Sequence, residues 1–123
     1  MNGNKIFIDT NICIYLLNGD LILSELLQEQ VIYISIITEI ELYAHHSSIS
    51  AKKVLDEFVA SVNVIEIDQK VKQQAIEFRR DFKLKLPDTI VAASAHSNNL
   101  PLLTADTGFK RIAGLNLFLY EKS

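Results

Sequence analysis

The sequence is poor in the residues that mark secreted or disordered proteins. Its single cysteine, Cys13, excludes a disulfide within the chain and fits a reducing compartment. Only 4 Gly and 2 Pro occur among 123 residues, and hydrophobic residues make up 49%, so we expect an ordered globular fold. No apolar run is as long as a membrane span, and the first residues lack the apolar region of a signal peptide. These absences predict one cytoplasmic domain over residues 1–123, without a membrane segment.

Several catalytic signatures are also missing. There is no glycine-rich phosphate loop and no Gly-x-Ser-x-Gly motif. His45, His46 and His96 have no metal-ligand spacing, so we expect them on the surface or in packing contacts. A net charge of -3 does not by itself indicate nucleic-acid binding. One segment is nevertheless locally basic, through Lys70, Lys72, Arg79, Arg80, Lys83 and Lys85.

Short apolar segments alternate with amphipathic ones along the whole chain. The apolar segments predict strands at residues 5–9, 31–34, 62–67, 101–105 and 117–120. The helical spacing of apolar residues predicts helices at 11–17, 21–27, 38–45, 51–61, 71–84 and 88–98. Because strands and helices alternate, we expect an α/β fold with a mostly parallel central sheet of about five strands, flanked by helices on both faces.

Four acidic residues lie at the turn points of this pattern. Asp9 and Asp106 end two predicted strands, Glu41 lies just after another, and Asp88 opens a helix. In an open α/β sheet, ligands bind outside the carboxyl ends of the strands, so these carboxylates should converge on one rim. Clustered carboxylates repel one another and have raised pKa values unless a cation neutralises them. The pattern therefore predicts a site for a divalent metal ion.

Each acid also has a purely structural explanation. Asp9 and Asp88 could each cap the helix that follows, since Asp is a favoured N-cap residue. Glu41 could complete a capping box with Thr38. Asp106 suits a turn. Taken singly, each of these structural explanations is favoured over a metal site.

Taken together, the four acids favour a site. Asp9 follows a strand that is too apolar to be exposed, and a charge there is costly unless it is used or paired. Glu39 and Glu41 are two residues apart, so on a helix they point to nearly opposite sides. Glu41 is expected at the edge of the core, and Glu39 is expected to face water.

Four segments of the chain, in their order and spacing, resemble the PIN-domain nucleases, and most closely the VapC toxins of prokaryotic toxin–antitoxin pairs. They are residues 7–11, 35–42, 88–95 and 103–106. The resemblance implies that Asp9, Glu41, Asp88 and Asp106 are the catalytic, metal-binding acids. It also places Asn11 and Thr104 beside that site, where they would orient carboxylates or substrate.

Two positions depart from the family pattern. Many relatives have glycine four residues after the glutamate, where this chain has His45. Some have a further acid two residues beyond the last aspartate, where this chain has Gly108. Neither departure removes one of the four acids, although the second leaves fewer ligands for a second metal ion.

The resemblance implies a metal-dependent endoribonuclease that acts as the toxin of a VapBC-like pair. The cofactor would be Mg²⁺ or Mn²⁺, since hard cations prefer carboxylate and water oxygens at roughly 2.0–2.1 Å. Such an ion would polarise the scissile phosphate and activate a water, leaving a 5′-phosphate and a 3′-hydroxyl. The RNA substrate would approach along Lys83 and Lys85, and along Lys110 and Arg111.

The resemblance also implies two protein partners, namely a cognate VapB-like antitoxin and a second copy of the chain in a homodimer. The apolar residues of the 12–27 region could form the antitoxin surface or belong to the core. Two other functions are open. A degenerate PIN domain could act as a non-enzymatic binding module. A small aspartate-dependent phosphatase is a third possibility, but that class needs an acid two residues after Asp9, where this chain has Asn11.

Overall fold

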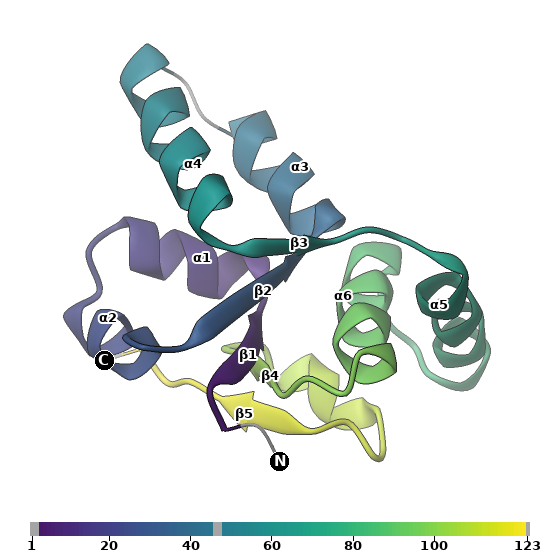
Figure 1. Cartoon of the computed structure of the whole chain (residues 1–123). Coiled ribbons are helices and arrows are strands. Elements are labelled where there is room, and N and C mark those ends of the chain that lie inside the picture. Colours follow the sequence, from purple (N-terminus) through teal and green to yellow (C-terminus); the bar gives the residue numbers. More distant parts are fainter. Residues whose placement is uncertain (1–2, 46–47, 123) are drawn as a thin grey trace.

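The structure is a computed structural model that describes residues 3–45 and 48–122 (Figure 1). The prediction for His46 lies outside the described residues. The centre of the fold is a five-stranded sheet in the order β3-β2-β1-β4-β5, and every neighbouring pair is parallel. The strands are β1 Lys5–Ile8, β2 Val31–Ser35, β3 Asn63–Ile65, β4 Leu102–Thr104 and β5 Leu117–Leu119.

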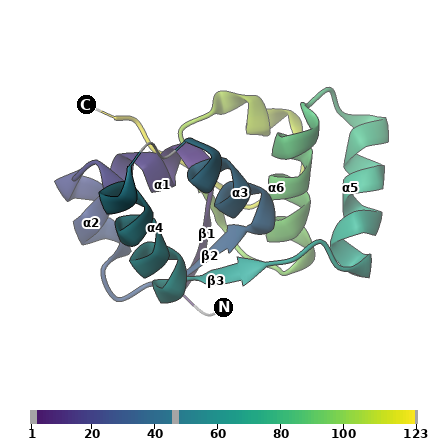
Figure 2. The same ribbon diagram turned by 90° about the horizontal axis from the view of Figure 1, so that it is seen from above.

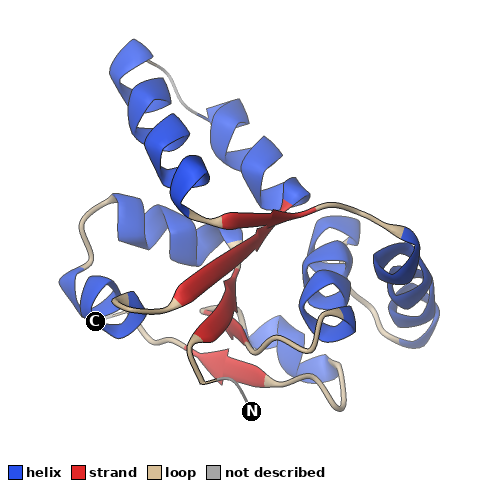
Figure 3. Cartoon of the chain, viewed as in Figure 1, coloured by secondary structure: helices blue, strands red, loops and turns tan. Residues whose placement is uncertain are grey.

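Helices cover both faces of this sheet. They are α1 Thr10–Leu17, α2 Leu21–Leu27, α3 Ile36–His45, α4 Ile49–Ser61, α5 Gln69–Asp81, α6 Leu86–Ser97 and the short 3₁₀ helix η1 Thr107–Arg111. Figure 3 shows α1 to α4 on one side of the strands, and α5, α6 and η1 on the other. This arrangement confirms the predicted α/β fold with a parallel five-stranded sheet between two helical layers.

The two helical layers enclose two separate apolar cores. Successive side chains of a strand point to opposite faces, so Phe7 and Ile8 of the central strand belong to different cores. Phe7 packs with residues of α5 and α6, including Phe78. Ile8 packs with residues of α1 to α4, including Ile12 and Leu42. Because β1 is buried on both faces, the chain that leaves its carboxyl end is fixed from both sides.

Several element boundaries differ from the predicted ones. Helix α3 begins at Ile36 directly after β2, so Thr38 lies inside the helix and is fully buried. The predicted capping box of Thr38 and Glu41 is therefore wrong. Helix α6 begins at Leu86, so Asp88 lies in its first turn and is not its N-cap. Helix α5 ends at Asp81, before an extended residue Phe82, and residues 82–85 form the connection to α6.

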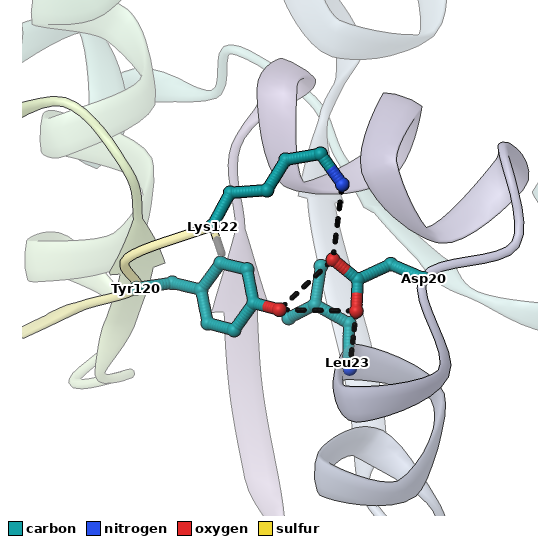
Figure 4. A network of polar contacts seen from close by, with 4 residues as sticks. All are labelled: Asp20, Leu23, Tyr120 and Lys122. Carbon is teal, nitrogen blue, oxygen red and sulfur yellow. Dashed lines mark hydrogen bonds and ion pairs between the residues drawn. The ribbon is translucent and has the colours of Figure 1, made fainter.

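The carboxyl-terminal segment is fastened to the turn between α1 and α2 (Figure 4). The Asp20 carboxylate caps α2 by accepting from the Leu23 N–H at 3.0 Å, and it also accepts from the Tyr120 hydroxyl at 2.8 Å and 3.0 Å. Lys122 Nζ lies 3.5 Å from the same carboxylate and 5.0 Å from the centre of the Tyr15 ring. The hydrogen bond from Leu23, followed by those from Tyr120 and Lys122, lowers the pKa of Asp20. These contacts hold the end of β5 against the first two helices.

Across the described residues, no single helix has the length and hydropathy to cross a membrane, and only α1 and α2 together, bent by 113°, pass that test of length and composition.

Candidate metal and nuclease site

Asp9 leaves the carboxyl end of the central strand and caps α1. Its Oδ1 accepts a hydrogen bond from the Ile12 N–H at 3.1 Å, and its Oδ2 accepts one from the Thr104 hydroxyl. Asp9 is only 6% exposed, and Thr104 is fully buried at the end of β4. The Thr104 oxygen also accepts the Asp106 N–H at 3.0 Å. One buried hydroxyl therefore links two of the predicted site residues.

Glu41 lies in the second turn of α3 and is joined to the start of α1. Its Oε1 accepts a hydrogen bond from the Thr10 hydroxyl at 2.6 Å, and that hydroxyl lies 3.0 Å from the hydroxyl of Thr38. The hydrogen bond from Thr10 thus fixes the orientation of the Glu41 carboxylate, and Thr38 fixes the Thr10 hydroxyl. Sequence reasoning assigned no role to Thr10. Its place directly after Asp9 was the signal that could have revealed it.

Asp88 and Asp106 complete the group from the two remaining elements. Asp88 is partly buried in the first turn of α6, where the helix dipole favours a negative charge. Asp106 is exposed and caps η1, with its Oδ1 accepting the Gly108 N–H at 2.8 Å. A Cβ atom on Gly108 would lie 3.0 Å from that oxygen. Gly108 therefore leaves room for the Asp106 carboxylate, and a bulkier residue there would press on it.

The four acids line one cleft of about 240 Å³. Its other lining residues are Thr10, Asn11, Ile14, His45, Pro87 and Val91. The structure thus brings together five of the six residues predicted for the site, and Thr104 lies behind Asp9. Glu39 does not line the cleft, as expected. His45 is exposed but faces the cleft, and His96 packs against the Phe78 ring at 5.5 Å.

The carboxylates in the cleft affect one another electrostatically. Burial raises the pKa of Asp9, the hydrogen bonds from Thr104 and Ile12 oppose that rise, and the charges of Asp106 and Asp88 add to it. Burial also raises the pKa of Asp88, with further contributions from Asp106 and Glu41, while Lys85 opposes the rise. Like charges that disfavour one another in this way create a demand for a cation.

The chemistry of these donors fits a hard divalent cation, because all four are carboxylates. The positions of the four carboxylates, in contrast, do not yet form a complete binding site for one ion. Within residues 3–45 and 48–122, no three His, Cys, Asp or Glu side chains already lie close enough together to share an ion. Glu41 and Asp106 are engaged in hydrogen bonds within the protein. Sharing one ion therefore requires carboxylates to rotate toward Asp9.

Two further cavities border the acidic cleft. One of about 860 Å³ shares Asp88 and Asp106 with it and is lined by basic residues of α5, the 82–85 connection and η1. The other, of about 440 Å³, shares Ile14, Glu41 and His45 with it. This second cavity is an apolar groove between α1, α3 and α4, and Leu17, Leu42, Val54 and Leu55 are among its lining residues.

Comparisons with known proteins found a matching protein family and several solved structures with a similar fold. The model of the PIN domain family matches residues 6–115. A toxin–antitoxin complex from Klebsiella pneumoniae contains a chain with a TM-score of 0.82 and 30% identity, over 95% of this chain and 99% of that one. A chain of VapBC2 from Rickettsia felis, a complex bound to a DNA fragment from its promoter, has a TM-score of 0.82 and 23% identity, again over 95% of this chain and 99% of that one.

A more distant neighbour is VapC20 from Mycobacterium tuberculosis, described as a toxin that cleaves the sarcin-ricin loop. Its TM-score is 0.63 and its identity 18%, over 90% of this chain and 97% of that one. At that identity the similarity shows the fold alone, as it does for the Rickettsia felis protein. No curated protein matches the chain.

Proposed function

Because this chain belongs to the PIN domain family, we propose that it is a metal-dependent endoribonuclease and the toxin of a VapBC-like toxin–antitoxin pair. The observation that supports this most strongly is the cleft that Asp9, Glu41, Asp88 and Asp106 line together. The likeness to a chain of a toxin–antitoxin complex at 30% identity supports the biological role. PIN nucleases generally use divalent metal ions, which agrees with four carboxylate donors.

Asp9, Glu41, Asp88 and Asp106 would hold Mg²⁺ or Mn²⁺. When bound, the cation polarises the scissile phosphate and makes an attacking water more acidic. The protein's own part is to position the carboxylates. Thr104 and the Ile12 N–H fix Asp9, and Thr10 fixes Glu41.

Asn11 lies at the exposed edge of the same cleft. Its amide can donate to a phosphate oxygen and accept from a ribose hydroxyl, so we assign it to substrate orientation.

The antitoxin would dock in the apolar groove between α1, α3 and α4. The groove opens onto Glu41, so a segment with apolar side chains could fill it and present Arg or Lys to the carboxylates. Of the two alternatives for the 12–27 region, the groove would use only part of its apolar residues. Ile12, Cys13, Leu23 and Leu27 belong to the core, while Ile14 and Leu17 line the groove.

The two glutamates of α3 provide the sharpest test of the enzymatic role. Glu41→Gln should abolish RNA cleavage, because Glu41 lines the cleft, and Glu39→Gln should leave it unchanged. Both changes remove one negative charge from the same helix, so each controls for the other. If both variants cleave RNA as fast as the unaltered chain, Glu41 has no role in cleavage. Absence of cleavage by the unaltered chain would favour the degenerate binding module.

The toxin role is tested in cells. Expression of the chain alone should arrest growth, co-expression of the small protein encoded next to it should restore growth, and Asp106→Asn should be harmless. A homodimer remains a prediction from the family resemblance, and light scattering after size-exclusion chromatography measures it directly.

A further inference from the structure

The large cavity beside the acidic cleft gathers positive charge on an acidic protein. Arg79, Lys83, Lys85 and Arg111 line it, although the chain as a whole has a net charge of -3. In the part of the chain that the structure describes, the ion pairs are Lys52–Asp56 and Lys122–Asp20. None of the four cations in the cavity is therefore neutralised by an acidic side chain within 4.0 Å.

Two of these cations are held in place by the backbone. Arg79 on α5 donates from Nη1 to the Leu84 carbonyl at 3.0 Å. Arg111 on η1 donates from Nη1 to the Lys83 carbonyl at 2.7 Å. The 82–85 connection is thus fastened from two sides by elements that lie beside α6 (Figure 2). Each guanidinium uses one of its five N–H donors in this bond and has others left for a ligand.

We propose that this cavity binds the phosphate next to the scissile phosphate of a single-stranded RNA. The inference rests on the proposed nuclease function, since it extends the substrate path from the acidic cleft. Asp88 and Asp106 line both cavities, so an RNA strand whose scissile phosphate lies at the acids continues directly into the basic cavity. Arginine and lysine are the side chains that bind phosphate oxygens by charge-assisted hydrogen bonds.

The remaining walls of the cavity suit a nucleotide. Phe82, Leu84 and Leu86 contribute apolar surface beside the cations. A base or ribose can pack on this surface while its phosphate contacts the arginines and lysines. An acidic peptide could also bind the four basic side chains, but its binding would not depend on the cavity being continuous with the acidic cleft. The shared wall of Asp88 and Asp106 therefore favours RNA, and peptide binding is an outcome that the experiment must separate.

The experiment measures binding of a short, fluorescently labelled single-stranded RNA by anisotropy, in EDTA and over a series of salt concentrations. Exposed basic residues outside the cavity supply matched controls. Arg79→Gln is paired with Arg80→Gln, and Arg111→Gln with Lys53→Gln, because Arg80 and Lys53 are exposed but do not line the cavity. Lys83→Gln is the variant that removes charge without removing a side-chain bond to the connection.

Arg79→Gln, Lys83→Gln and Arg111→Gln should each weaken binding roughly two- to fivefold, the range for one ion pair on a solvent-accessible surface. Each should also reduce the slope of log Kd against log salt by about 0.7, the value for one lost phosphate contact to a single strand. Both control variants should bind as the unaltered chain does. Unchanged melting temperatures would show that the variants fold.

The proposal is overturned if lining and control variants lose affinity equally, or if the unaltered chain does not bind the RNA. It is also overturned if only the two arginine variants weaken binding and the slope of log Kd against log salt stays constant. The arginines would then act only by holding the 82–85 connection in place, without contacting phosphate. Weakened binding of an acidic peptide with unchanged RNA binding would assign the cavity to the peptide. Cleavage of RNA by the unaltered chain in Mg²⁺ is scored separately, so the nuclease function can stand while this subsite fails.

Discussion

The buried hydroxyl of Thr104 should have a larger effect on stability at neutral pH than in acid. Thr104→Val keeps the approximate shape of the side chain but removes the donor to Asp9 and the acceptor of the Asp106 N–H. Asp9 is 6% exposed, so water cannot replace the lost donor freely. A hydrogen bond to a charged group contributes about 1.5–3 kcal/mol, and we expect Thr104→Val to lower the free energy of unfolding by that amount at neutral pH.

The pH dependence follows from the direction of the Asp9 pKa. Burial raises this pKa in the folded state above the ordinary value of about 3.9, so the folded protein binds the proton more tightly than the unfolded chain. The contribution of Asp9 to stability therefore increases as the pH falls through the folded pKa, and it is lost as the pH rises. Below that pKa Asp9 is neutral, and the lost hydrogen bond costs only about 0.5–1.5 kcal/mol.

Urea unfolding from about pH 8 to about pH 4 in EDTA measures both effects. Thr104→Ser is the matched control, because it keeps the hydroxyl and loses only a methyl group. The difference between Thr104→Val and the unaltered chain should shrink as the pH falls, while the difference for Thr104→Ser should stay constant. A loss below about 0.5 kcal/mol at neutral pH, or a loss independent of pH, would refute the role assigned to this hydroxyl.

Three other predictions concern the cleft and the groove. Mn²⁺ should raise the melting temperature of the unaltered chain, and Asp9→Asn should abolish this shift while leaving the metal-free protein as stable or more so, because repulsion from Asp88 and Asp106 is relieved; an intact shift would place the ion elsewhere. Gly108→Ala should weaken the Mn²⁺ response, since its Cβ would lie 3.0 Å from the Asp106 carboxylate, and an undiminished response would show that the carboxylate moves aside freely. Val54→Asp should reduce rescue by the antitoxin without affecting RNA cleavage, because Val54 lines the apolar groove and neither the acidic cleft nor the basic cavity; equal rescue would exclude that groove as the docking site.

The sequence predicted the architecture well because several independent features of it indicated the same fold. The strands at the centre of the sheet are continuous apolar runs, Asp9 and Asp106 closely follow two of them, and Glu41 and Asp88 lie in the early turns of two helices. It failed at the start of α3, where Ile36 and Ile37 are β-branched and favour a strand by propensity. In the structure the helix begins directly after β2, where the Ser35 hydroxyl accepts a hydrogen bond from the Ile37 N–H at 3.0 Å, and Thr38 therefore lies inside the helix.

The basic cavity shows what a single sequence does not reveal. Lys83, Lys85 and Arg111 were expected along the RNA path because they lie near Asp88 and Asp106 in the chain, and all three line the cavity. Lys110 was expected there too, but it does not line the cavity. The bond from Arg111 to the Lys83 carbonyl joins residues 28 positions apart, and such a contact has no periodic signature. Only the tertiary structure shows which of two neighbouring basic residues lines the cavity.

The most direct test of the central claim is incubation of the purified chain with a labelled RNA in Mg²⁺ or Mn²⁺ and, in parallel, in EDTA, followed by analysis of the product ends. A cleft of four carboxylates that acts through a divalent cation should give 5′-phosphate and 3′-hydroxyl ends with either metal, and no product in EDTA or with Asp88→Asn. Cleavage that survives EDTA, products with cyclic phosphate ends, or no cleavage under any of these conditions would contradict the account.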